Sequence, residues 1–245
     1  MSLQEIKKLK ELLQRLETED KNLRVFGASG HKYKLRPTLS KSELQEFEQT
    51  YQVKLPEDYR FFLKEIGNGG AGPGYGLYPL SKTTDNFRPD VPFSLASLSP
   101  LTDGWQSIPL IDDALVPGII EIETRGCAHA TYLVVNGDTY GTIWNCWSID
   151  EILPTGLSFS AWYWQWVDKM EKKALPILAR EREAERIREG MSLQEAVDTL
   201  GGQWHIKEDS WTNRRFLVFD GLATNFKIDE NDIIVESFEW DIIVW

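Results

Sequence analysis

Two stretches contain residue types that could do chemistry: the glycine run at 69–74, and Cys127 and His129, with Cys146 further along. A glycine-rich loop binds phosphate when it leads from a strand into the N-terminus of a helix, whose N–H groups hold the anion. Here the run Gly69-Gly-Ala-Gly-Pro-Gly74 follows a predicted helix, contains a proline and is not followed by Lys-Ser or Lys-Thr. We interpret it as a helix exit that leads into a tight turn.

The cysteines and histidines do not predict a metal site, because structural zinc needs four convergent ligands, usually from paired short spacings. Both cysteines lie in or beside apolar, strand-like sequence, so we expect buried thiols. Neither a Gly-x-Ser-x-Gly nor a His-Glu-x-x-His motif occurs. Scattered carboxylates form no recognisable acid–base pair; examples are Asp112, Asp113, Glu121 and Glu123. We predict no enzyme activity, no metal and no cofactor.

The composition argues against several classes of protein. A net charge of −11 over 245 residues disfavours nucleic acid as a partner, because binding phosphates requires a basic face. No stretch approaches the roughly 20 apolar residues that span a bilayer, and the charged N-terminus does not resemble a secretory signal. Two cysteines are too few for a disulfide framework. We expect a cytoplasmic protein with no membrane partner.

Aromatic side chains are the abundant resource of this sequence. Trp162 and Trp166 share one face of a predicted helix, and Trp164 points elsewhere. Trp144 and Trp147 must face different sides of a predicted strand. Tryptophan and tyrosine are enriched at protein interfaces, so the outward-facing rings, Trp164 among them, are candidates for recognition.

The elements that must position these side chains begin with helices and continue with strands. Ser-x-x-Glu capping boxes mark helix starts at Ser2, Ser40 and Ser192. The best-defined helix places Pro56 in its first turn and ends near Gly67. We expect helices over 2–17, from Ser40, from Pro56, over 159–173 and over 191–200. We expect strands over 75–80, 116–122, 131–135, 140–147, 203–207, 214–220, 223–228 and 233–239. Residues 82–109 are expected to form a long loop or an irregular crossing segment.

These elements predict a main domain over residues 1–173, a charged helical connector over 174–189 and a small acidic unit over 190–245. Residues 171–189 mix six basic with five acidic side chains, which is typical of a solvated helix. Residues 190–245 contain four Lys and Arg against eleven Asp and Glu. An acidic surface can steer a basic protein partner, and it can also serve solubility alone. The last unit is near the lower size limit for independent folding, so we expect it to lean on the main domain.

Five motifs together resemble one family. They are Leu-Pro-Glu-Asp-Tyr-Arg-Phe-Phe-Leu at 55–63, Gly-Asn-Gly-Gly at 67–70, Tyr-Gly-Leu-Tyr-Pro-Leu at 75–80, Gly-Thr-Ile-Trp at 141–144 and Phe-Ser-Ala-Trp-Tyr at 159–163. Over about residues 35–173 the chain resembles the Smi/Knr cell-wall-assembly regulator family of the SUKH superfamily. The resemblance implies an α+β fold, with helices packed on a mainly antiparallel, curved sheet. It also implies binding without catalysis: bacterial members are mostly immunity proteins that neutralise toxins, often nucleases, and fungal members act in cell-wall signalling.

We therefore expect a non-enzymatic module that neutralises a cognate protein toxin by stoichiometric binding. The alternatives are a cell-wall-assembly scaffold with several protein partners, and a small-ligand-binding protein or enzyme built around Tyr75, Trp105 and Trp144. The contact is expected near the 67–75 turn and the 82–109 loop. The expected anchors are Tyr75, Phe87 and Trp105, the expected charges are Glu57, Asp58 and Asp103, and Trp164 is a further candidate.

Overall fold

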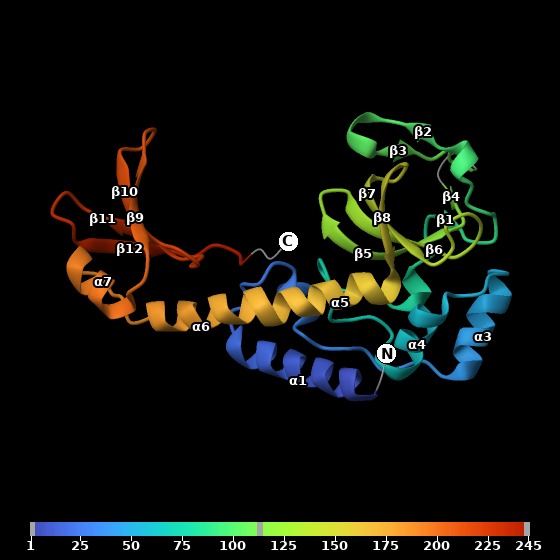
Figure 1. The fold of residues 1–245 in the computed structure, drawn as a ribbon, viewed down its shortest axis with the longest axis horizontal. Helices are drawn as coiled ribbons and strands as arrows, with labels where there is room; N and C mark the ends of the chain where they lie inside the picture. The colour runs from blue at the N-terminus through green and yellow to red at the C-terminus, as the bar shows by residue number, and fades with distance from the viewer. Residues whose placement is uncertain (1–2, 112–114, 243–245) are drawn as a thin grey trace. The chain divides into compact units, whose positions relative to one another are not determined.

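The computed structural model describes residues 3–111 and 115–242 and is drawn in Figure 1. The chain forms two compact units. Unit 1 consists of residues 1–17 and 27–168, and unit 2 consists of residues 18–26 and 169–245. The charged segment 174–189, which the sequence predicts as a connector, falls within unit 2.

The helices of unit 1 bury the apolar stripes that their spacing predicts. α1, Leu3–Glu19, buries Ile6, Leu9, Leu12, Leu13 and Leu16. Ser2 of its predicted capping box lies outside the described residues. α2 is the single turn Ala28–His31, and α3, Lys41–Thr50, begins with the predicted capping box between Ser40 and Glu43. α4, Glu57–Glu65, starts directly after Pro56, and α5, Phe159–Lys169, follows the last strand.

A six-stranded sheet of order β2-β3-β8-β7-β6-β5 forms the centre of unit 1, and all its neighbouring strands are antiparallel. Its strands are β2 Ser99–Pro100, β3 Gln106–Ser107, β5 Ile119–Gly126, β6 His129–Val134, β7 Thr142–Ser148 and β8 Glu151–Ser158. A separate parallel pair joins β1, Phe87–Arg88, to β4, Val116–Pro117. The α+β class and the mainly antiparallel sheet are thus confirmed.

Aromatic rings form the packing contacts between α4 and α5 and between the sheet and the β1–β4 pair. Tyr59 and Phe62 of α4 contact Phe159 of α5, with ring centroids 4.7 and 5.2 Å apart. A second cluster, which includes Tyr132 and Trp144, packs the sheet against β1 and β4. Each fully buried ring of this size removes on the order of 150–250 Å² from water, so these contacts dominate the burial of apolar surface.

Two strand predictions in unit 1 need correction. Residues 75–80 form no strand: only Leu77 makes isolated bridges there, to Gly70 and Glu123. The predicted strand over 116–122 is divided into β4 and β5 by Gly118, whose φ is 66°. The 82–109 segment is irregular but not a plain loop, because it contains β1, β2, β3 and two short 3-10 turns, Leu95–Ser97 and Thr102–Gly104, and a third turn, Leu80–Lys82, ends at its first residue.

Unit 2 packs helices on a four-stranded antiparallel sheet of order β12-β11-β10-β9. After the π-helical turn Met170–Ala174, its helices are α6 Leu175–Ala184 and α7 Leu193–Leu200. Its strands are β9 Trp204–Asp209, β10 Arg214–Phe219, β11 Asn225–Ile228 and β12 Ile234–Phe238. The predicted helix and all four predicted strands are present, and Ser192 and Glu195 form the predicted capping box.

The segment 18–26 is joined to the rest of unit 2 by polar contacts. Arg24 Nη1 donates to Glu181 Oε2 at 2.7 Å, and Arg24 Nη2 donates to Thr224 Oγ1 at 3.1 Å. The backbones of Val25 and Ile242 form a parallel bridge. Unit 2 is therefore completed by residues that lie between the two segments of unit 1 in the sequence. Among the described helices of the chain, none combines the length and apolarity that a membrane span needs.

Candidate functional site

The glycine run presents Tyr75 at the surface of unit 1. Gly74 packs so closely on β5 that a Cβ there would collide with Glu123 Oε2 and the Thr124 carbonyl oxygen. The Tyr75 N–H donates to Thr124 O at 2.9 Å, which fixes the run against the strand. The Tyr75 side chain is 42% exposed. The glycines therefore serve a close backbone approach, as the interpretation of the run as a turn requires.

A line of aromatic side chains continues from Tyr75 along the end of the sheet. A Cβ at Gly126 would lie 3.3 Å from Tyr75 Cε2, so the ring lies over the end of β5. His129 is paired with Gly126 across the β5–β6 turn, and its ring centroid is 4.7 Å from that of Trp147. The Trp147 ring is 5.8 Å from that of Trp105. We name Tyr75, His129, Trp147 and Trp105 the aromatic ridge.

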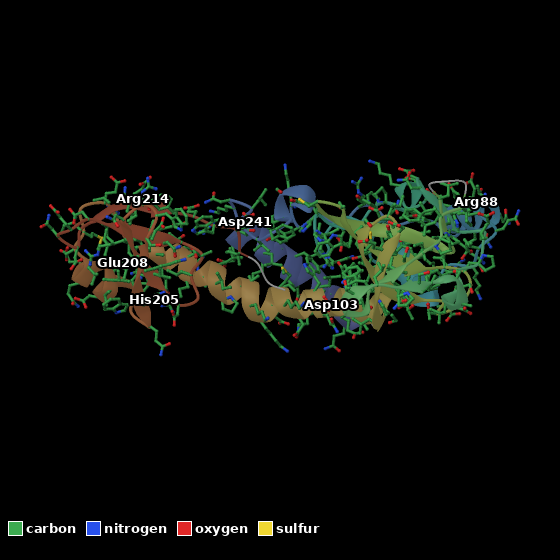
Figure 2. The ribbon with its side chains drawn as sticks, turned by 90° about the horizontal axis from the view of Figure 1, so that it is seen from above. Arg88, Asp103, His205, Glu208, Arg214 and Asp241 are labelled. Carbon is green, nitrogen blue, oxygen red and sulfur yellow. The ribbon has the colours of Figure 1, made fainter. Side chains whose placement is uncertain are left out.

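Trp147 is the most exposed ring of the ridge, with 55% of its surface accessible. Leu101, in the β2–β3 connection, and Ile149, in the β7–β8 turn, are further exposed large apolar residues of this sheet. Asp103 is exposed in the Thr102–Gly104 turn, which immediately precedes Trp105, and it is labelled in Figure 2. Exposed rings bordered by aliphatic and acidic side chains are typical of protein interfaces.

Two tight turns flank residues of the ridge, and they differ in the residue types that adopt positive φ values. Asp103 and Gly104 both have positive φ values, 56° and 81°, which this residue pair readily adopts. Cys127 and Ala128, between β5 and β6, also have positive φ values, 49° and 66°. Neither Cys nor Ala favours that region, so the β5–β6 turn is strained. Backbone strain of this kind tends to occur at functional sites.

A buried carboxylate, that of Glu123, lies in β5 close to the β5–β6 turn. Glu123 Oε1 accepts hydrogen bonds from Thr131 Oγ1 at 2.6 Å and Arg125 Nε at 3.0 Å. Glu123 Oε2 is buried and has no hydrogen-bond partner among the described residues. Burial raises the pKa of the Glu123 carboxyl, and the Arg125 charge and the two hydrogen bonds only partly oppose this. Glu123 links β5 to β6 through its hydrogen bond from Thr131 and is not at the surface.

The cysteines give no chemistry to the ridge. Cys146 is buried as predicted, and burial raises the pKa of its thiol to about 11. The prediction of a buried Cys127 is wrong, because this residue is exposed at the β5–β6 turn. Within residues 3–111 and 115–242, no group of three or more His, Cys, Asp or Glu side chains could hold a metal ion. Asp112 and Asp113 fall outside these residues.

The structure brings three of the predicted site residues together, Tyr75, Asp103 and Trp105. The other predicted residues lie elsewhere in unit 1. Phe87 cannot be a surface anchor, because it is only 5% exposed and packs against Tyr132 with ring centroids 5.2 Å apart. Trp164 is half-buried on α5, and its indole N–H has no hydrogen-bond partner among the described residues.

Glu57 and Asp58 lie at the opposite end of the sheet from the ridge. The N-terminus of α4 adjoins the β6–β7 connection, where Tyr140 Oη donates to the Lys54 carbonyl oxygen at 2.9 Å. Glu57 is exposed there. Asp58 is occupied structurally, because its Oδ2 accepts from the Ser160 N–H at 2.8 Å and so links α4 to the start of α5.

Trp147 and His129 join the predicted residues into one surface, and neither of them was among the predicted site residues. Trp144 is buried in the core beside Phe93, so Tyr75, Trp105 and Trp144 do not line one common cavity. Strand geometry could have identified Trp147 as a surface residue, because it must face outward if Trp144 faces inward. Nothing in the sequence indicates that Trp147 meets Trp105, because that contact depends on the β3–β8–β7 register.

Comparison with family models gives one match, to the SMI1 / KNR4 family (SUKH-1), over residues 38–165. Searches of curated proteins and of solved structures found no match. The matched residues include the six-stranded sheet, α3, α4 and every residue of the aromatic ridge, and they exclude the C-terminal sheet of unit 2. Because the match covers more than half of the sequence, the chain belongs to the SMI1 / KNR4 family (SUKH-1).

Proposed function

We propose that this protein neutralises a bacterial toxin by stoichiometric binding, without catalysis, and that the aromatic ridge is the centre of the interface. The exposed Trp147 ring, held between Trp105 and His129, is the observation that carries the proposal. Large rings on a rigid sheet lose little conformational entropy on binding, and such residues dominate the energies of most interfaces. Membership of the family supports a protein as the partner.

The chemistry of the ridge suits a partner with an apolar centre and a basic border. Trp147, Trp105 and Tyr75 provide the apolar contact, and Asp103 adds a carboxylate at the edge. The net charge of −11 would speed the approach of a basic protein, such as a nuclease toxin. We place the cognate toxin gene next to the gene for this protein.

The test is co-expression of the full chain with the product of the neighbouring gene, and isothermal titration of the purified pair. Trp147→Ala should weaken binding about tenfold or more, because truncation of a central aromatic anchor typically costs at least 1–2 kcal/mol. The matched control is Trp211→Ala in unit 2, which removes an even more exposed tryptophan and should leave the affinity unchanged.

Two outcomes would refute the proposal for that pair. The first is that cells die as readily with the wild-type protein as without it and that no complex forms. The second is a complex whose affinity is insensitive to both Trp147→Ala and Trp105→Ala. A native pull-down that yields many sub-stoichiometric partners, with no single stoichiometric band, would favour a scaffold.

A further inference from the structure

The four-stranded sheet of unit 2 has two unlike faces. One face is buried: Leu217, Phe219, Phe226 and Ile228 pack with Ala196 of α7. The side chains that alternate with these form the other face. By strand register this face consists of His205, Lys207 and Asp209 of β9, Arg214, Phe216 and Val218 of β10, Asn225 and Lys227 of β11, and Glu236 and Phe238 of β12. We name it the open face, because each of its side chains is exposed or half-exposed.

Positive charge is concentrated on the open face of an otherwise acidic unit. Three of the four Lys and Arg residues in 190–245 lie on it, namely Lys207, Arg214 and Lys227, but only two of the eleven Asp and Glu residues do. Figure 2 labels His205 and Arg214 of this face, with Glu208, which alternates to the other side. A random distribution of charge would leave this face acidic, like the rest of residues 190–245.

Apolar side chains occupy the middle of the same face. Phe216 and Phe238 contact each other, with ring centroids 5.6 Å apart, and Val218 is half-exposed beside them. Trp211, at the tip of the β9–β10 hairpin, is 96% exposed. Its turn is ordered, since Asp209 accepts from the Trp211 N–H at 3.0 Å and from Thr212 Oγ1 at 2.6 Å. The hairpin therefore presents this ring on a fixed backbone.

We propose that the open face binds an acidic, extended polypeptide segment that carries aromatic side chains. Lys207 and Arg214 match carboxylates, whereas Lys227 already lies 3.5 Å from the Glu236 carboxylate of the same face. The Phe216–Phe238 pair matches a ring or an aliphatic chain. This surface belongs to unit 2, outside residues 38–165, and is independent of the toxin contact proposed for the ridge.

The experiment measures the fluorescence anisotropy of a labelled peptide that is titrated with the full chain. The peptide has about 12 residues and consists of glutamates with a phenylalanine at every fourth position, so that all phenylalanines lie on one face of an extended strand. The variant Lys207→Gln, Arg214→Gln, Lys227→Gln should weaken binding about tenfold or more, and added salt should weaken binding to the wild type. The control carries three exposed lysines of unit 1 as glutamine, Lys7→Gln, Lys10→Gln and Lys64→Gln, and should bind like the wild type.

Several results would overturn the proposal: no binding to the wild-type chain, unchanged binding to the triple variant, or equal binding of the same peptide with lysine in place of glutamate. A single-stranded oligothymidine that binds more tightly than the peptide, and is lost in the triple variant, would reassign the face to nucleic acid. Circular dichroism confirms the fold of each variant, and the salt dependence needs no variant. Unaltered toxin neutralisation by the triple variant separates this test from that of the ridge.

Discussion

Each unit buries one glutamate beside an arginine, and the two carboxyl groups shift in opposite directions. In unit 1, Glu123 has a fully buried side chain, one oxygen without a hydrogen-bond partner among the described residues, and a raised pKa. In unit 2, burial also raises the pKa of Glu181, but hydrogen bonds from Thr224, Arg24 and Ala223 outweigh it and the net shift is downward. The pairing with arginine is common to both, so the deeper burial of Glu123 and the additional donors to Glu181 together give the two shifts opposite signs.

The largest effect is expected when the unit 2 glutamate loses its charge. Glu181→Gln removes the closer of the two carboxylates that pair with Arg24, leaving only Glu239 at 3.7 Å from its Nε, and presents an amide to groups that need an acceptor. Breaking one side of a buried pair typically costs about 3–5 kcal/mol, a large fraction of the stability of so small a unit. Hydrogen exchange read by mass spectrometry should show a loss of protection over 204–238 and no loss of protection over 119–158.

Glu183→Gln is the matched control for this change, since Glu183 is exposed on the same helix. It should leave exchange unaltered in both units. Equal losses of protection in unit 1 and unit 2 on Glu181→Gln would contradict a network that serves unit 2 alone.

The two glutamates should also give the units opposite pH dependence. Glu181 has a folded pKa below 4.5, so its stabilisation is present above pH 4.5 and is lost as the pH falls through the folded pKa. Glu123 has a folded pKa above 4.5, so its contribution is fully present below pH 4.5 and is lost as the pH rises through the folded pKa. Acidification therefore destabilises unit 2 through Glu181 and relieves unit 1 through Glu123.

Glu123→Gln tests this contrast with an effect smaller than that of Glu181→Gln. At pH 7 it should stabilise unit 1 by about 1 kcal/mol, because a buried charge with an unsatisfied oxygen is removed and Arg125 can be hydrated. At pH 4 the gain should disappear. Urea unfolding at both pH values measures this, and a destabilisation at pH 7 that becomes smaller at pH 4 would show that the ion pair with Arg125 outweighs burial.

The comparison also shows what local sequence can and cannot predict. Ser40 and Ser192 begin helices as predicted, because a capping box is complete within four residues. Phe87 was expected at the surface because its segment reads as a loop, yet pairing of β1 with the distant β4 buries it. The buried networks are equally non-local, since Arg24 is 157 residues from Glu181 in the sequence.

The ridge illustrates the same limit. Tyr75 could be selected as an aromatic side chain at the end of the predicted 67–75 turn, and Asp103 and Trp105 as side chains of the predicted 82–109 loop. Their union through His129 and Trp147 depends on a β5–β6 turn at Cys127-Ala128, a pair without the Asn, Asp or Gly that marks such turns. The missing turn signal is also why Cys127 was expected to be buried.

A smaller effect is expected from relieving that turn. Cys127→Asn with Ala128→Gly supplies residues that adopt positive φ readily, and it should stabilise unit 1 by about 1 kcal/mol. Gly104→Ala, in the turn that already has suitable residues, should destabilise by a similar amount because φ is 81° there. Thermal unfolding measures both. A destabilised Asn-Gly variant would show that the Cys127-Ala128 backbone is not strained.

The smallest expected difference lies between the two capping boxes, which have the same geometry in different units. In each, the serine Oγ accepts from the glutamate N–H at 3.2 Å, and the glutamate Oε2 accepts from the serine N–H at 2.8 Å. Ser40→Ala and Ser192→Ala should each cost about 1 kcal/mol, because an N-cap is a local interaction. Segment-resolved hydrogen exchange should therefore show a loss of protection over 41–50 in the first variant and over 193–200 in the second.

Ser192→Ala should also raise exchange in the unit 2 strands, because α7 covers that small core through Ala196. If Ser40→Ala spreads as widely through unit 1, the two units do not differ in cooperativity, and the contrast between them is confined to their buried glutamates.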